Sequence, residues 1–183
     1  MFESELGIFR YFLMRLTTRG RYAVTALLDL AVQENRHQGA VSLSDIAKRQ
    51  SISISYLEQL FSKLRKKGLV NSTRGASGGY HLAKPLDEID IMSIITAVDE
   101  SVNAMQCGGK GDCQDGAMCL THDLWHNLSA HIEAYLSNVT LDELLNSNNT
   151  QNIAERQEYK ALSNKGDRKD HINTINLLGV NPA

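Results

Sequence analysis

The order of hydrophobic patterns along residues 18–83 narrows the possible folds of this 183-residue chain more than any other feature. Three segments carry apolar residues at helical spacing, and two short strand-like runs follow them. In chain order the five segments are 18–32, 43–49, 53–67, 69–73 and 80–83. A glycine-rich turn, residues 74–79, separates the two strand-like runs. Three helices followed by a β-hairpin is the layout of a winged helix-turn-helix, so we expect a mainly α fold with a small β-hairpin wing.

Helical patterns return after the hairpin. Asp90 can cap a fourth helix over residues 91–98, and a loop rich in glycine and aspartate follows it. A longer amphipathic helix is expected from about residue 120 to residue 138, and Thr140 begins a capping box for a last short helix. After Asn146 the chain is rich in Asn, Ser and Gln without hydrophobic periodicity, which predicts a disordered tail.

Charge is distributed unevenly along the chain. Residues 1–85 contain 13 of the 19 Lys and Arg residues and 6 of the 21 acidic residues, so this half carries +7 and residues 86–183 carry −9. A basic half of this kind suggests binding to a polyanion such as nucleic acid. No apolar run approaches the ~20 residues of a membrane span, and Arg10 interrupts the short apolar run of 7–13, which does not fit a secretory signal. We therefore expect a cytoplasmic protein.

The third expected helix supplies candidates for reading DNA. With its apolar stripe buried, the opposite face presents side chains that can bond to base edges or phosphates. These are Ser55, Glu58, Gln59, Ser62 and Lys66, with Lys63, Arg65 and Lys67 adding positive charge. Arg74 at the wing tip is placed to reach a minor groove, and Arg15, Arg19 and Arg21 near the first helix are candidate phosphate contacts.

All 3 cysteines lie in one loop, with the spacing Cys107-x5-Cys113-x5-Cys119-x2-His122. Clustered thiols in a reducing compartment indicate metal or redox chemistry. Since Cys119 and His122 are separated by one helical turn, we expect both to project from the first turn of the following helix. A Cys3His set fits either tetrahedral zinc or an iron–sulfur cluster, and the long gaps favour the larger inorganic core. A catalytic Cys/His pair would need an orienting third group, which this pattern does not supply, so we expect no enzyme.

Several segments together resemble the Rrf2 type of bacterial winged-helix regulators, and within it the members that sense iron–sulfur clusters. The resemblance lies in Met14–Val24, Ser55–Phe61, the wing Arg74–Tyr80, Ala97–Ser101 and the Cys3His loop. It covers residues 14–147. Residues 1–13 and the tail lie outside it, and Ala76-Ser77 stands where proline and glycine are frequent in the wing.

The resemblance implies a homodimer on double-stranded DNA at operator and promoter sites, with the long helix after the loop crossing to the partner subunit. It implies one [2Fe–2S] cluster per subunit, bound by Cys107, Cys113, Cys119 and His122. The clustered form is then expected to repress or activate iron–sulfur assembly genes. One class of DNA site needs the cluster and another is read without it, and Glu58 matches the residue that discriminates between them. An iron–sulfur assembly scaffold is a candidate cluster donor. Such a protein works in the bacterial cytoplasm and on the nucleoid, without a membrane.

These expectations divide the chain into four parts. Residues 1–13 are a leader or alternative-start segment ahead of Met14, and 14–89 are a winged helix-turn-helix DNA-binding domain. Residues 90–146 hold the cluster-binding loop and dimerisation helices, and 147–183 are the disordered tail. Two alternatives stay open: a related regulator that senses nitric oxide or iron with another cluster type, and a zinc-stabilised repressor. An electron carrier without a DNA role would leave the basic half and the wing unexplained.

Overall fold

The structure is a computed structural model, and it describes residues 17–37, 39–75, 77–105 and 107–160. Its elements in chain order are α1 (Thr18–His37), α2 (Leu43–Gln50), α3 (Ile54–Lys66), β1 (Val70–Thr73), β2 (Gly79–Leu82), the 3-10 helix η1 (Leu86–Glu88), α4 (Ile91–Ala97), α5 (His122–Asn138) and α6 (Leu141–Asn146). A further helix covers 148–160. The expected leader 1–13, Met14 and Arg15 lie outside the described residues.

Three helices begin at side-chain caps, and two of these caps, Asp90 and Thr140, are predicted from the sequence. Each cap side chain accepts a hydrogen bond from the backbone N–H of the residue three positions later, which satisfies one of the free donors of the first helical turn. The pairs are Ser42 with Asp45, Asp90 with Ser93 and Thr140 with Glu143. Gly68 follows α3 with a φ of +70°, a left-handed conformation in which glycine commonly ends a helix.

One hydrophobic core joins α1 to the elements around it. Leu57, Leu60 and Leu64 form the buried stripe of α3, and Leu27 and Leu30 of α1 are fully buried in the same core. Packing of the apolar stripe against α1 and α2 leaves the opposite face of α3 in solvent, which is the arrangement expected of a helix-turn-helix.

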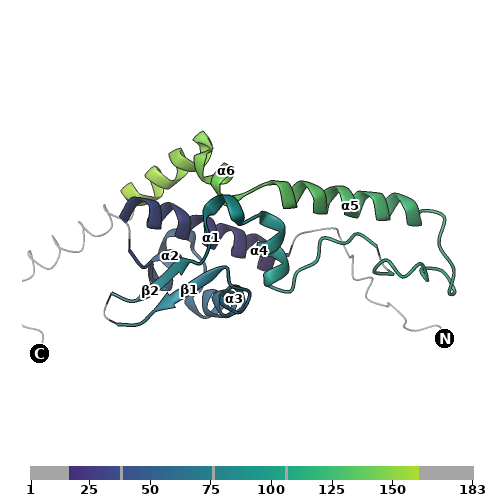
Figure 1. Ribbon diagram of the computed structural model, residues 1–183, viewed down its shortest axis with the longest axis horizontal. Coiled ribbons are helices and arrows are strands. Elements are labelled where there is room, and N and C mark those ends of the chain that lie inside the picture. Colours follow the sequence, from purple (N-terminus) through teal and green to yellow (C-terminus); the bar gives the residue numbers. More distant parts are fainter. Residues whose placement is uncertain (1–16, 38, 76, 106, 161–183) are drawn as a thin grey trace, which may run out of the picture.

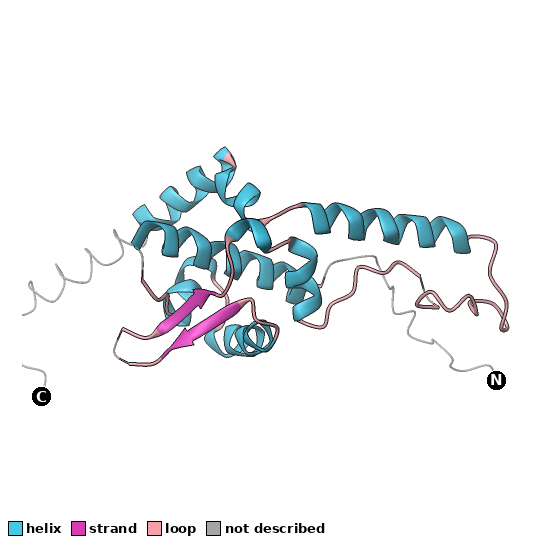
Figure 2. Cartoon of the chain, viewed as in Figure 1, coloured by secondary structure: helices cyan, strands magenta, loops and turns pink. Residues whose placement is uncertain are grey.

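The hairpin is attached firmly to this core. Its strands pair antiparallel with Val70 opposite Leu82, and the ring of Tyr80 packs edge-on against Phe61 with centroids 4.8 Å apart. Tyr80 also exchanges two backbone hydrogen bonds with Val41, at 2.9 and 3.0 Å. The chain approaches so closely there that a Cβ on Gly79 would lie 2.6 Å from the Val41 carbonyl oxygen. The mainly helical fold with a β-hairpin wing is therefore confirmed (Figure 2).

The start of the tail is ordered, which differs from the disorder expected for 147–183. Residues 148–160 form a helix, and Ala154 is buried with Val32 and Leu145. Polar contacts also join the same helix to the body, among them Gln157 with Gln50 and Glu158 with Arg36. The helix is held by contacts with residues far away in the sequence, which a local pattern does not reveal. Residues 161–183 lie outside the described part.

Helix α5 extends away from the body, and the loop that carries the cysteines runs beside it (Figures 1 and 2). Its C-terminal half packs against α4, and Ile132 and Leu136 join the main core. Towards its N-terminal end Leu124 is 59% exposed and Trp125 is 39% exposed. Among the described residues, no helix is long and apolar enough to cross a membrane.

Candidate DNA-reading surface and metal centre

The outer face of α3 gathers the residues that the sequence predicts for DNA reading. One shallow depression is lined by six side chains, which we call the reading face: Ser55, Glu58, Gln59, Ser62, Lys63 and Lys66. All six are exposed or half-buried, on the side of the helix opposite the buried leucines. The face mixes carboxylate, amide, hydroxyl and ammonium groups, which together can bond to base edges and to phosphates. That these residues contact DNA stays a prediction.

Two basic residues of α3 have partners that the sequence did not indicate. Lys63 Nζ lies 2.8 Å from a carboxylate oxygen of Asp99, which follows α4. The hydrogen bond from Lys63 holds the pKa of the Asp99 carboxyl below its usual range. Arg65 donates to the hydroxyl of Ser72 at 3.2 Å and so joins α3 to β1. The carboxylate of Asp99 therefore already binds the ammonium group of Lys63, which is predicted from the sequence to contact DNA.

The other arginines predicted to contact DNA are not among the six residues of the reading face. Arg19 and Arg21 are exposed in the first turn of α1, and Arg74 is exposed where the chain leaves β1 for the wing tip. Gly75 follows Arg74 with a φ of +120°, a conformation that L-residues rarely adopt. The turn at the wing tip therefore depends on a glycine beside the predicted minor-groove arginine.

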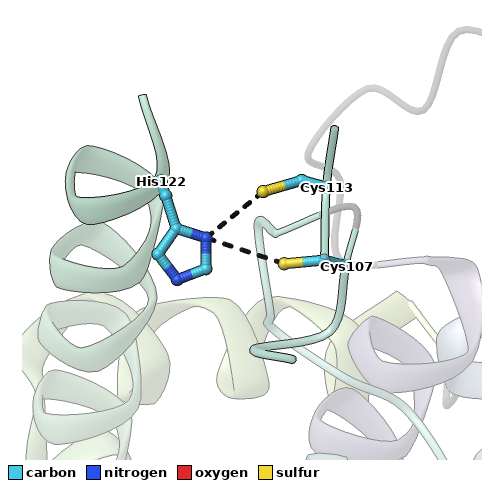
Figure 3. Close-up of side chains that lie close together, drawn as sticks. All are labelled: Cys107, Cys113 and His122. Carbon is cyan, nitrogen blue, oxygen red and sulfur yellow. Dashed lines mark hydrogen bonds between the residues drawn. The ribbon is translucent and has the colours of Figure 1, made fainter. Parts of the chain in front are cut away.

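The loop and the start of α5 bring a thiol pair and an imidazole together (Figure 3). The Nδ1 atom of His122 lies 3.4 Å from Cys113 Sγ and 3.8 Å from Cys107 Sγ. The ligand atoms of all three residues lie within 4.8 Å of one another, and each residue is half-buried. The three cysteines are free thiols. Two thiols and one imidazole at this spacing can hold a soft metal.

Cys119 lies beside this group of three ligand atoms but is not part of it. Its backbone N–H donates to Cys113 Sγ at 3.3 Å, while its own Sγ lies 3.7 Å from Thr121 Oγ1. The expectation that Cys119 projects from the first helical turn is wrong, because α5 begins at His122 and Cys119 precedes it. Its carbonyl instead accepts from the His122 N–H at 3.1 Å, in the turn that leads into the helix.

The three thiols differ in acidity because of their neighbours. A backbone hydrogen bond from Gly111, supported by one from Gly109, lowers the pKa of Cys107. A hydrogen bond with Cys113 lowers the pKa of Cys119, to which Thr121 adds. The pKa of Cys113 is raised in spite of the hydrogen bond from the Cys119 backbone, because partial burial and the two other thiols favour its protonated form. Lower pKa values favour the thiolate, which is the form that binds metals.

A buried serine of α5 accepts a hydrogen bond from the backbone at the beginning of the cysteine loop. Ser129 is 3% exposed and is the one buried residue of α5, a helix that the structure describes in full. Its hydroxyl accepts from the Ala104 N–H at 2.9 Å and donates to the Trp125 carbonyl at 2.8 Å. Asn103 accepts from the Met105 N–H at 2.8 Å in the same stretch. Sequence reasoning missed this contact, for which a serine on the inner side of an amphipathic helix was the available signal.

Comparison with known proteins assigns the chain to a family. Residues 16–147 match the family model Rrf2, described as "Iron-dependent Transcriptional regulator". The chain belongs to the Rrf2 family of transcriptional regulators. Members of the Rrf2 family are regulators and not enzymes, which agrees with the sequence-based expectation.

Curated members of the Rrf2 family are similar to this chain along nearly its whole length. The "HTH-type transcriptional regulator IscR" of Photobacterium profundum is 53% identical over 173 residues, which cover 91% of this chain and 98% of that protein. The protein of the same name in Vibrio cholerae is 51% identical over 172 residues, with 92% and 98% covered. The predicted resemblance to the Rrf2 type of regulators therefore agrees with the relatives that the chain matches.

Solved structures share the fold of this Rrf2-family chain. CymR, the global cysteine regulator of B. subtilis, superposes with a TM-score of 0.62 at 32% identity, covering 73% of this chain and 97% of that one. T. potens IscR superposes with a TM-score of 0.58 at 37% identity, covering 72% and 85%.

Proposed function

We propose that this Rrf2-family protein is a transcriptional regulator that senses iron–sulfur cluster status through one [2Fe–2S] cluster per subunit. Cys107, Cys113, Cys119 and His122 are the proposed ligands. Iron–sulfur assembly genes are the proposed targets, repressed or activated from operator and promoter sites. The observation that carries the proposal is the group of Cys107, Cys113 and His122 in a chain that is 53% identical to a protein named IscR.

The donor atoms of this site fit a metal centre. In a tetrahedral site, a sulfur atom about 2.3 Å from the metal and a nitrogen atom about 2.1 Å from it lie about 3.6 Å from each other. The observed separations between His122 and the two thiols, 3.4 and 3.8 Å, lie on either side of this value. A bound iron–sulfur cluster supplies a link between loop and helix that depends on iron supply and redox state. The backbone N–H of Cys119 donates to Cys113 Sγ, so Cys119 lies next to this group and is the proposed fourth ligand of the Cys3His set.

The protein side of the switch is the order of the cysteine loop. Three of the proposed ligands lie in the loop and one lies at the start of α5. When all four bind the cluster, the loop is held against the helix, and when the cluster is lost, the loop is released. Such a local change of order is a recognised way to bias two conformations of a regulator. On the DNA side, the reading face of α3 contacts bases in the major groove, and Arg15, Arg19, Arg21 and Arg74 contact phosphates or the minor groove.

A homodimer formed through α5 is the proposed assembly. Leu124 and Tyr135 are 59% and 69% exposed, and they share one side of α5 with Leu128 and His131 at the four- and three-residue spacing of a helix–helix seam. An exposed apolar side on a long projecting helix is typical of an interface. We place the dimer in the bacterial cytoplasm, on the nucleoid when DNA is bound, with an iron–sulfur assembly scaffold as the cluster donor.

The experiment that tests the cluster is a count of iron and sulfide on protein purified without oxygen, with absorption and circular dichroism spectra. The expected result is visible bands with two irons and two sulfides per subunit. Cys119→Ala and His122→Ala are each expected to lose most of the bound iron. His126→Ala is the matched control. His126 lies on the next turn of α5 and is exposed, and the centroid of its ring is 6.4 Å from that of His122. Equal iron loss in the control would contradict the ligand assignment.

A zinc-stabilised repressor is the second candidate, favoured by the single-metal spacing of Cys107, Cys113 and His122. This candidate predicts a colourless protein with one zinc per subunit and DNA affinity that does not change with iron supply. Footprinting of the metal-loaded and metal-free forms on the same DNA separates the two. Some sites occupied only by the loaded form, beside other sites occupied by both forms, support sensing. Footprints that change together at every site, or at none, support a structural metal.

A further inference from the structure

Asp99 lies among three cations of the proposed DNA-binding surface. Its carboxylate is 2.8 Å from Lys63 Nζ, and Lys67 and Arg19 attract it from a greater distance. The side chains of Asp99 and Lys63 are 69% and 36% exposed, so solvent and other anions can reach the pair. The three cations come from α3, the residue that ends it and the first turn of α1. One carboxylate is therefore shared by two elements of the DNA-binding surface.

The backbone at Asp99 breaks two local preferences of proteins. Asp99 follows the C-cap Val98 of α4 with a φ of +57°, a position that most often holds glycine. Its negative charge also lies at the C-terminal end of a helix, where the helix dipole favours positive charge. Local stability does not explain an aspartate at this position. Residues that contradict local rules without a local gain are often retained for function.

The carboxylate of Asp99 resembles a DNA phosphate in what it offers to Lys63. Both are anionic oxygen acceptors that an ammonium group binds as a point charge. Lys63 is part of the reading face, beside Ser62 and Lys66, so a phosphate that borders the groove under α3 meets Lys63 as well. The phosphate and Asp99 therefore compete for the same cation.

We propose that Asp99 is an affinity-determining residue of the DNA-binding surface, and that its carboxylate occupies the place of a DNA phosphate between Lys63, Lys67 and Arg19. DNA binding then exchanges one anion for another at Lys63. This inference rests on the proposed DNA-binding function. Its consequence is a limit on sequence-independent affinity, since phosphate contacts supply most of that affinity.

The expected size of the effect is modest because the pair is exposed. Exposed ion pairs contribute little, in a range that corresponds to at most about fivefold in an equilibrium constant. Asp99→Asn is expected to tighten binding to a duplex of unrelated sequence by about two- to fivefold per bound protomer. Asparagine tolerates the positive φ, so the backbone is kept while the charge is removed. Each newly available phosphate contact also steepens the plot of log K against log salt by about 0.9.

The measurement is fluorescence anisotropy of a labelled duplex with the full chain, over about 50 to 200 mM salt, a range in which phosphate contacts change affinity strongly. Asp87→Asn is the matched control, because it removes the same charge from an exposed position of η1. The 3-10 helix η1 packs against α6, and Figure 1 shows α6 and α3 on opposite sides of α1. The control is expected to leave the salt slope unchanged.

A double-mutant cycle tests whether Asp99 acts through Lys63. Lys63→Gln is expected to weaken binding, and Asp99→Asn is expected to gain less in the Lys63→Gln background than in the wild type. Equal affinity and salt slope for Asp99→Asn and Asp87→Asn, or an undiminished gain without Lys63, would overturn the inference. Failure of the wild type to bind any duplex would instead overturn the proposed function. Thermal unfolding of each variant shows whether an affinity change reflects a loss of folded protein.

Discussion

Glu58 is exposed in the middle of the reading face, where most neighbours can donate or accept a hydrogen bond but a carboxylate can only accept. In the major groove it finds donors on cytosine and adenine, whereas guanine presents two acceptors. A base without a donor therefore leaves this carboxylate desolvated and unpaired, which costs about 1–3 kcal/mol per wrong base pair. Selectivity at this residue arises from rejection as much as from attraction.

Glu58→Ala is expected to let the cluster-free protein bind sites that otherwise require the cluster, with a gain of roughly 5- to 150-fold for one relieved contact. Gln59→Ala, one residue along the same face, is the control and is expected to weaken binding, because an amide that donates and accepts is removed. Titration of both variants without cluster against one cluster-dependent site checks the prediction. Unchanged affinity of Glu58→Ala for that site would show that Glu58 has no discriminating role.

At the scale of elements, α5 and the cysteine loop depend on the buried hydroxyl of Ser129. Ser129→Ala leaves the Ala104 N–H without its acceptor in a partly buried place, at a cost of about 1–3 kcal/mol. We expect the loop to loosen and bound iron to be lost to a chelator several times faster, while the DNA-binding helices keep their fold. Ser137→Ala, at an exposed position of the same helix, is the control. Equal rates of iron loss in the two variants would remove Ser129 from the support of the site.

The elements differ in how far sequence alone could predict them. The helices α1 to α4 and the hairpin could be predicted from the periodicity of hydrophobic residues and from cap residues such as Ser42 and Asp90. Both signals act within a few residues of the chain. The position of Cys119 outside the first turn of α5 depends on where the loop ends, which its glycines leave undetermined. Likewise, the pair of Lys63 with Asp99 and the bond of Ser129 with Ala104 join residues that no local pattern relates. The exposed residues of the reading face could therefore be predicted from the sequence, whereas the contact of Asp99 with Lys63 could not.

The helix over 148–160 has no periodic hydrophobic signal in the sequence, and its attachment to the body can be tested. Ala154→Glu places a charge in the buried contact with Val32 and Leu145, so the free energy of unfolding is expected to fall by about 1–3 kcal/mol. Asn152→Glu adds the same side chain at an exposed position of the same helix and is expected to change little. Denaturant unfolding measures both, and hydrogen exchange over 148–160 locates the change. Equal stability of the two variants would mean that this helix does not contribute to the fold.

At the scale of the whole molecule, the reading face and the metal site lie in different parts of the chain, and α5 extends from the body that carries α3 (Figure 1). The segment between α4 and α5 contains both Asp99 and the cysteines, and Asp99 contacts α3 directly. A change of order in the cysteine loop and the charge beside Lys63 are therefore features of one continuous segment. A second copy of the chain, joined through the exposed side of α5, would present two reading faces to one duplex.

The last prediction concerns the proposed dimer. Leu124→Glu places a charge on the exposed apolar side of α5, where it would be desolvated between two copies of the helix, so the protein is expected to become monomeric. Loss of the second reading face removes the gain from simultaneous binding, which is commonly about 10²- to 10⁴-fold. Ala130→Glu adds the same charge to another exposed side of α5 and is expected to keep the dimer. Sedimentation gives the mass of each variant, and anisotropy on a two-half-site duplex gives its affinity. A dimeric Leu124→Glu protein with wild-type affinity would place the interface elsewhere, whereas a monomer with wild-type affinity would show that one reading face suffices.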